Sequence, residues 1–286
     1  RALSVGALPA QPDTMRTPPY LPYLAGPPGL APGLKPIDPD RWLLPDSEAE
    51  AWLPEKTVLM RTHRAQVFAD TGVPDAVAET ATAVLAVTGP GSCTWDSPLE
   101  DAASRVSDDL CILLPDARGE WMLRAASLVA PTFWSLAEKI GQPLAGLHGT
   151  VPDANPELVS RISRMFDALR PGTVLERFNW TVQASRARFT PRSAPLKAMA
   201  RTTPDEAALD LLYFRVERQT ISKLPGTGAV LFTIRVCMDP LSAALPDARH
   251  RKAFAAAWDG IDPVLGAYKG WPAYDRLVRA ALAQLA

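Results

Sequence analysis

Charged side chains interrupt an otherwise apolar segment at residues 212–220, and this segment is the first place where the sequence could support chemistry. Side chains of an extended strand alternate between its two faces. Arg215 and Glu217 therefore share one face, and Arg218 and Thr220 share the other. Two interpretations stay open: an ion-pair network inside a sheet, or the floor of a polar pocket in which arginines bind carboxylates and Glu217 binds a cation.

The segment 229–238 predicts a second strand of the same kind. It follows residues 223–228, whose Pro-Gly-Thr-Gly sequence indicates a turn. Thr233 and Arg235 fall on one face of this strand, and apolar residues fall on the other. We therefore expect two neighbouring strands whose polar groups belong to the same network or pocket.

A lone histidine is the second chemical signal. Residues 134–148 predict a short helix that ends at Gly141, followed by a loop that leads to His148. Such a histidine is either a packed or solvated side chain, or the single axial imidazole that heme needs from a protein. The chain has only three histidines, so a metal site built from several of them is nearly excluded.

Motifs for common redox and nucleotide cofactors are missing. Residues 226–231 (Gly-Thr-Gly-Ala-Val-Leu) begin like a dinucleotide-binding motif, but they end in leucine and lead into a strand rather than a helix. The sequence also lacks a P-loop, a GxSxG elbow and an HExxH helix. Redox chemistry in this protein would therefore need electrons from a partner protein.

The three cysteines, Cys93, Cys111 and Cys237, are widely separated. Their spacing fits neither a disulfide framework nor a zinc ribbon, an iron–sulfur cluster or covalently attached heme. We expect free thiols in a reducing cytoplasm.

The elements that must position these residues predict an α+β fold. Five strands are expected at 110–114, 120–128, 174–183, 209–220 and 229–238. Helices are expected at 48–70, from Pro74, and at 99–106, 133–140, 156–169 and 248–285. Because strands and helices do not alternate, we expect an antiparallel sheet with helices on one side rather than a doubly wound nucleotide fold.

Proline is concentrated at the start of the chain, where 11 of the 29 prolines lie in the first 46 residues. Proline prevents a continuous helix there, and the aromatic residues Tyr20, Tyr23 and Trp42 favour an extended arm that lies against the body from about residue 18. A solvated proline-rich ligand segment is the alternative. The predicted order within one domain is the arm (1–46), a helical cap (47–107), the sheet core (108–240) and C-terminal helices (241–286).

Composition excludes several classes of protein. The 286 residues carry 30 Lys+Arg against 31 Asp+Glu, so a basic nucleic-acid surface is not expected. The hydrophobic content of 47% argues against disorder, and no apolar run has the length of a membrane span. The first eight residues are too weakly apolar for a signal segment, and the sequence starts at Arg1 rather than at methionine, so its native start is left open.

Several of these segments together resemble one family, the alpha-subunit-like family of heme-dependent oxidative N-demethylases. The segments are Gly33-Leu34-Lys35-Pro36, residues 134–148 with Val151-Pro152, Arg177-Phe178-Asn179-Trp180, and Arg215–Thr220 followed by Leu224–Arg235. The resemblance extends over roughly residues 18–285, and the last segment is the most specific. The chain departs from the family at Val236-Cys237, where a polar or aromatic pair is usual.

The resemblance implies a PAS-like antiparallel sheet that binds heme b, with His148 as the axial ligand. It further implies O₂-dependent monooxygenation of a small methylated amine such as dimethylamine, with release of formaldehyde and with electrons from a separate reductase subunit or protein. Within this framework we expect Glu217 to anchor the substrate ammonium and Arg215 to act beside it. The other expected cofactor-binding residues are Arg218, Arg235, Thr220, Thr233 and Lys139, and Asn179 and Trp180 are expected to line the pocket.

Other functions remain compatible with the sequence. The heme could serve as a gas sensor or carrier, it could oxidise a different amine or small molecule, or the chain could be a subunit that has lost heme. His63 and His250 are the alternative imidazole ligands, and Cys111 and Cys237 are the alternative thiolate ligands.

Overall fold

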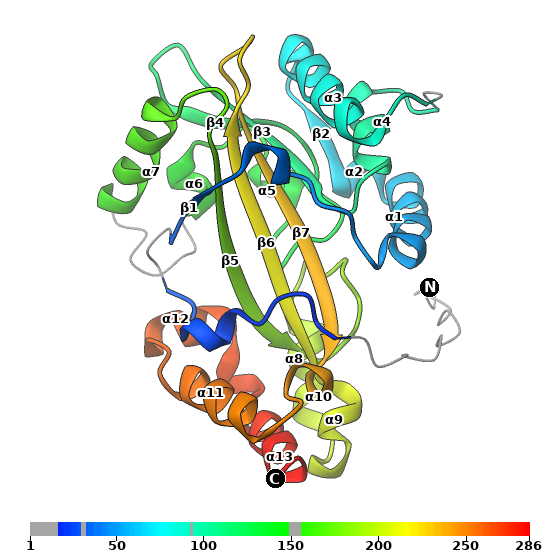
Figure 1. The fold of residues 1–286 in the computed structure, drawn as a ribbon, viewed down its shortest axis with the longest axis vertical. Helices are drawn as coiled ribbons and strands as arrows, with labels where there is room; N and C mark the ends of the chain where they lie inside the picture. Colours follow the sequence, from blue (N-terminus) through cyan, green and yellow to red (C-terminus); the bar gives the residue numbers. More distant parts are fainter. Residues whose placement is uncertain (1–16, 30–32, 92–93, 149–155) are drawn as a thin grey trace.

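A seven-stranded antiparallel sheet forms the centre of the protein (Figure 1). The computed structural model describes residues 17–29, 33–91, 94–148 and 156–286, without the side chains of His148 and Pro156. The strands are β1 (Lys35–Ile37), β2 (Phe68–Asp70), β3 (Asp109–Pro115), β4 (Trp121–Ser127), β5 (Val174–Gln183), β6 (Tyr213–Lys223) and β7 (Val230–Pro240). Their order across the sheet is β1-β5-β6-β7-β3-β4-β2. The eleven-residue strands β6 and β7 therefore lie in the middle.

The α+β class is confirmed, but the predicted count of five strands is wrong. Strands β3 to β7 correspond to the five predicted ones. The structure adds β1 and β2, which are three-residue edge strands and too short to show a period of two in the sequence. The fourth predicted strand also starts too early, because residues 208–211 form a helical turn, α9 (Ala208–Leu211), before β6 begins.

Helices surround the sheet. Before β3 lie α1 (Ala49–Thr62), α2 (Arg64–Val67), α3 (Pro74–Thr88) and α4 (Pro98–Ser104). Between β4 and β5 lie α5 (Leu136–Lys139), α6 (Leu144–His148) and α7 (Pro156–Ala168), and α8 (Ala194–Thr202) lies between β5 and α9. After β7 come α10 (Leu241–Ala244), α11 (Ala248–Asp259), α12 (Pro263–Lys269) and α13 (Asp275–Gln284). No helix in the described residues is long and apolar enough to cross a membrane.

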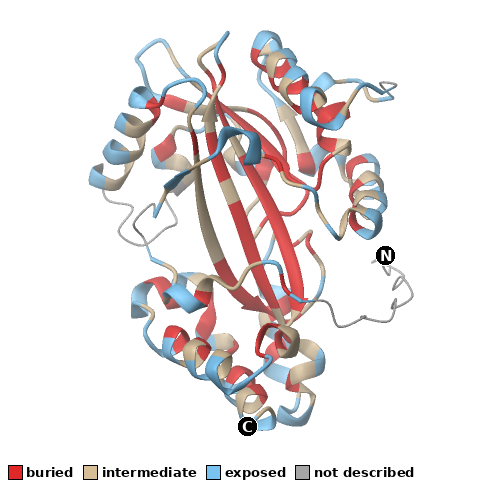
Figure 2. Ribbon diagram, in the orientation of Figure 1, coloured by how far each residue is buried: buried red, intermediate tan, exposed pale blue. Residues whose placement is uncertain are grey.

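Both faces of the sheet are covered, so the expectation of helices on one side is wrong. One face packs on α5, α6 and α7. On the opposite face the rings of Trp180 and Phe214 pack with Phe254 of α11 and with Trp271 of the 3₁₀ turn η4 (Trp271–Ala273). Figure 2 shows the consequence, because β6 and β7 are buried over most of their length while the outer sides of the helices are exposed.

The proline-rich arm lies against this opposite face from residue 17 in the described residues. Tyr23, in the 3₁₀ turn η1 (Pro22–Ala25), is buried and donates its hydroxyl to the Ala244 carbonyl at 2.6 Å. Arg218 donates to the carbonyls of Arg41 and Trp42 at 2.6 and 3.1 Å. The arm is thus held by hydrogen bonds from buried side chains of the central strands.

Candidate active site

A cavity of about 500 Å³ lies on the sheet face that α6 and α7 cover. Small-molecule and cofactor sites have volumes of about 300 to 1,000 Å³, so the cavity has the size of such a site. Its walls come from the sheet, from residues 128–134, and from α6, α7 and α12.

Much of the wall is apolar. The apolar side chains that project into it from β3, β4, α6 and α7 are Leu113, Leu123, Leu144, Leu147, Leu158, Ile162, Met165 and Phe166. In α7 the cavity residues recur at intervals of three and four, which is the spacing of one helix face, while Arg161 and Arg164 on the same helix are exposed. The amphipathic sequence of α7 therefore explains why its apolar side chains cover the cavity on this face of the sheet.

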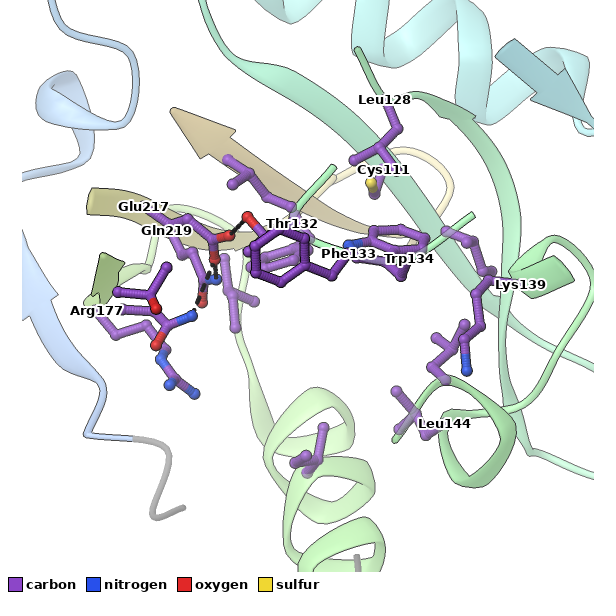
Figure 3. A pocket seen from close by; sticks show the side chains of 18 of the residues that line it. Cys111, Leu128, Thr132, Phe133, Trp134, Lys139, Leu144, Arg177, Glu217 and Gln219 are labelled. Carbon is purple, nitrogen blue, oxygen red and sulfur yellow. Dashed lines mark hydrogen bonds between the residues drawn. The ribbon is translucent and has the colours of Figure 1, made fainter. Parts of the chain in front are cut away.

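Polar side chains gather at one end of the cavity around Glu217, as Figure 3 shows. The Glu217 carboxylate is 8% exposed and accepts hydrogen bonds from Gln219 Nε2 at 2.7 Å and from Asn179 Nδ2 at 3.2 Å. Its other oxygen accepts from the Thr132 hydroxyl. These donors come from β6, β5 and the segment after β4, so three parts of the chain fix one carboxylate.

Arg215 supports this cluster from below. Its Nε donates to Thr132 Oγ1 at 2.7 Å, and its Nη2 donates to the Ala130 carbonyl at 2.7 Å. Its Nη1 donates to the Arg188 carbonyl at 3.2 Å. Arg215 is 1% exposed, so its guanidinium is shielded from solvent. Its hydrogen bond to Thr132 connects it to Glu217, to which the Thr132 hydroxyl donates.

Lys269, at the end of α12, extends the same chain of hydrogen bonds. Its ammonium donates to Asn179 Oδ1 at 2.7 Å, which orients the amide so that Nδ2 faces Glu217. No sequence motif marks Lys269 or Thr132, so the sequence did not predict either residue as part of the site. Only the tertiary fold brings them to the β6 carboxylate.

The electrostatics of the cluster keep Glu217 ionised. Burial alone would raise the pKa of Glu217, but the charge of Arg215 and the hydrogen bonds from Thr132 and Asn179 outweigh burial and lower it. Burial lowers the pKa of Lys269 to about 8, although the charge of Glu217 opposes the shift. Burial also lowers the pKa of Arg215 to about 10, so this guanidinium stays charged at neutral pH.

Two more cations line the cavity, Lys139 and Arg177. Lys139 donates to the Gly146 carbonyl at 2.8 Å. Arg177 projects from β5 beside Gln219, its register partner on β6. In the view of Figure 3, Arg177 and Glu217 lie at one end and Lys139 at the other, with Phe133 and Trp134 between them.

The segment that carries Thr132 is held in an unusual backbone conformation. Phe133 has a positive φ of 62°, which is uncommon for a residue with a side chain. The Phe133 amide donates to the Thr190 carbonyl at 2.8 Å, and buried Asp109 accepts from the amides of Val129 and Ala130 at 2.8 and 2.9 Å. Backbone strain of this kind persists where the surroundings enforce it, and here it places Thr132 over Glu217.

Four of the predicted cofactor residues, Arg218, Thr220, Thr233 and Arg235, lie on the opposite face of the sheet. Thr220 and Thr233 bond each other through their hydroxyls at 2.6 Å. Arg218 pairs with Glu176 at 2.6 Å, and Arg235 pairs with buried Asp108 at 2.6 Å. The alternation of β6 separates them from Arg215 and Glu217, so the ion pairs lie on one face of the strand and the cavity lies on the other.

The predicted heme ligand, His148, ends α6. Leu144 and Leu147 of that helix line the cavity, but the side chain of His148 lies outside the described residues. Neither His63 nor His250 lines the cavity: His63 packs on the Phe189 ring, and His250 bonds Asp247.

Among the cysteines, only Cys111 lines the cavity within the described residues, and burial raises its pKa far above that of an ordinary thiol. The buried side chain of Cys237 lies on the opposite face, and Cys93 lies outside the described residues. A protonated thiol is a poor metal ligand.

A sequence profile of one family, described as Haem-dependent oxidative N-demethylase, alpha subunit-like, matches residues 86–279. The chain belongs to this family. The matched range contains every cavity residue discussed above and strands β3 to β7. The family therefore indicates a heme-dependent oxidative enzyme of which this chain is the alpha-subunit type.

The cavity fits the group that the family implies. Heme needs an apolar slot for its macrocycle and a cation for its propionates, and the cavity combines the leucine-rich wall with Lys139 at one end (Figure 3). The match covers the helix that ends at His148. Asn179 and Trp180 both line the cavity as expected, although the ring of Trp180 packs on Trp271 of the opposite face with 4.9 Å between ring centroids.

Proposed function

We propose that this protein is a heme-dependent oxidative N-demethylase of small methylated amines. The N-methylated amine reacts with one O₂, two electrons and two protons, and the products are the demethylated amine, formaldehyde and water. Heme b, when bound, supplies the activation of O₂, and a separate reductase supplies the electrons. The observation that carries the proposal is the buried carboxylate of Glu217, held by three hydrogen-bond donors, on the floor of a cavity of cofactor size.

In this proposal the chain's own residues select and hold the amine. Glu217 accepts a hydrogen bond from the substrate ammonium, since a charge-assisted bond is strongest where water is excluded. Thr132 and Asn179 keep the carboxylate oriented, and Arg215 keeps it ionised. The apolar side chains of α7 exclude water from the N-methyl group.

The proposal also covers the residues that hold the cofactor, the fold of the sheet and the location of the protein in the cell. His148 is the proposed axial ligand, and Lys139 is a proposed propionate partner. Arg218, Arg235, Thr220 and Thr233 are not proposed to touch the cofactor. A PAS-like fold of the sheet and a cytoplasmic location are also proposed. The free thiols of Cys111 and Cys237 support a reducing compartment.

Two measurements on the purified protein test the proposal. The absorbance spectrum should contain a Soret band that shifts on reduction with dithionite, and its absence would refute heme binding. Dimethylamine, O₂ and an NADH-driven flavin and iron–sulfur reductase should together yield formaldehyde. A heme-loaded protein that yields none from a panel of methylamines would instead favour a heme-based gas sensor or carrier, or the oxidation of a different amine or small molecule.

A further inference from the structure

The charge balance of the cavity points to a ligand that carries an anionic group. Among the described residues that line the cavity, four are cationic (Lys139, Arg177, Arg215 and Lys269) and one, Glu217, is anionic. An ammonium substrate alone would add a further positive charge, whereas the two propionates of a bound heme would offset only part of this excess. A ligand with a carboxylate would reduce the imbalance, and a zwitterion would enter without adding net charge.

Three of these four cations already have acceptors within the protein. Arg215 donates to two main-chain carbonyls, Lys139 donates to the Gly146 carbonyl, and Lys269 donates to Asn179 Oδ1. For Arg177, no residue in the described part of the chain accepts a hydrogen bond from the guanidinium. Its interaction with Glu217 is one of charge at a distance rather than a bonded ion pair. Arg177 is therefore the cation of the cavity whose donors are available to a ligand.

The position of Arg177 relative to Glu217 suits a short zwitterion. In the β5–β6 register, Asn179 is opposite Glu217 and Arg177 is opposite Gln219. Residues two apart on a strand are separated by about 7 Å and point to the same face. The two side chains thus start on neighbouring strands one step apart and reach into the same end of the cavity (Figure 3). An ammonium and a carboxylate separated by one or two carbons would contact both.

We propose that Arg177 binds a carboxylate at the polar end of the cavity, and that this carboxylate belongs to the substrate, an N-methylated amino acid whose ammonium binds Glu217. The proposal rests on the proposed function for the role of Glu217. A heme propionate has the same chemistry as the substrate carboxylate and is the alternative source of the anion. Guanidinium binds carboxylates with two parallel hydrogen bonds, which explains why an arginine at this position recognises the group whichever molecule carries it.

The experiment compares Arg177→Gln with wild type. The matched control, Arg164→Gln, removes an exposed positive charge from α7, outside the cavity. Calorimetric titration measures the binding of N-methylglycine and of N-methylethylamine, which lacks the carboxylate, to each protein with and without heme. Titration of heme into the heme-free proteins is followed through the Soret band. Circular dichroism verifies that each variant is folded.

If the carboxylate is the substrate's, Arg177→Gln weakens N-methylglycine binding by about 10- to 100-fold. N-methylethylamine and heme then bind as they bind to wild type, and Arg164→Gln changes nothing. If the carboxylate is a propionate, the variant instead weakens heme binding and affects both amines alike. Unchanged affinity for both heme and N-methylglycine in a folded Arg177→Gln protein would overturn the proposal. A protein that binds N-methylglycine through Arg177 but takes up no heme would refute the proposed function alone.

Discussion

Glu217 is the carboxylate at the centre of the polar end of the cavity (Figure 3). Thr132, Asn179 and Gln219 donate to it, Arg215 and Lys269 act on it through the first two, and Arg177 lies beside it without a bond. A carboxylate with three donors keeps its orientation and still has room for one more. The remaining position is where a substrate ammonium would bind.

Replacing Glu217 by glutamine tests that role. Glu217→Gln keeps the size of the side chain but removes its charge and replaces one accepting oxygen by an NH₂ group, so we expect normal heme content and a loss of amine oxidation of at least about 100-fold in kcat/KM. The readouts are the Soret absorbance and the formaldehyde yield. Glu157→Gln, on the exposed side of α7, is the control, and wild-type turnover by Glu217→Gln would exclude Glu217 from the site.

Lys269 gives amine binding a predictable dependence on pH. Because its pKa is lowered to about 8, Lys269 is charged below pH 8 and neutral above it. Its positive charge disfavours a second cation near Glu217, so the affinity for dimethylammonium should increase about three- to tenfold as the pH rises through 8. Below that pH, Lys269→Met should already bind the amine as tightly as wild type does at pH 9. A variant that kept the step in affinity near pH 8 would show that another group titrates.

The face that carries Glu217 could be predicted from the sequence, whereas its neighbours could not. The period of two in residues 213–220 placed Arg215 and Glu217 together and Arg218 apart, as observed. The chemical types alone did not show that only one face borders a cavity. Thr132 donates to Glu217 from an irregular segment 85 residues earlier in the sequence. Lys269, 52 residues after Glu217 at the end of α12, connects to it through Asn179, and only tertiary packing determines both placements.

At the scale of elements, the central strands both hold the arm and form the floor of the cavity. Arg235 pairs with Asp108, which is fully buried, and donates to the carbonyls of Leu44 and Pro45. Arg218 donates to the carbonyls of Arg41 and Trp42 in the same way. A buried carboxylate that loses its partner is strongly destabilising, so the arm and the sheet depend on one another.

Removal of Arg235 should therefore destabilise the fold without changing the cavity. We expect Arg235→Met to lower the free energy of unfolding by about 3 to 5 kcal/mol, because Asp108 is left buried and unpaired. Urea unfolding gives the size of the loss, and heme titration should give an affinity equal to that of wild type. Arg161→Ala, which breaks an exposed pair with Glu157, should cost less than about 1 kcal/mol. Equal stabilities of the two variants would contradict this account of the arm.

Element prediction succeeded where a pattern was long and failed where it was short. Strands β3 to β7 each have seven or more residues, enough to show their character. Strands β1 and β2 have three residues each and exist because longer strands pair with them. Helix α8 was not predicted; its Pro195 lies in the first turn, where proline is compatible with a helix.

For the whole molecule, heme binding and stability should be linked. A ligand that binds only the folded protein stabilises it by mass action, by about 2.7 kcal/mol at a concentration 100 times its dissociation constant. We expect heme to raise the melting temperature by several degrees. His148→Ala should abolish both this rise and the imidazole-type spectrum while leaving the heme-free melting temperature unchanged. A His148→Ala protein with an unchanged spectrum would show that the ligand lies elsewhere.

The side chains of β6 and β7 alternate between the two faces of the sheet, and this alternation has a consequence for how the protein can evolve. Positions that face the cavity and positions that hold the arm alternate along the same strands and lie on opposite faces of the sheet. On the proposed function, substitutions at Glu217, Gln219 or their neighbour Arg177 would redirect ligand choice while the Arg218 and Arg235 ion pairs remain intact. The residues proposed to select the substrate and the residues that stabilise the fold alternate along one stretch of sequence. The two sets can therefore change independently of one another.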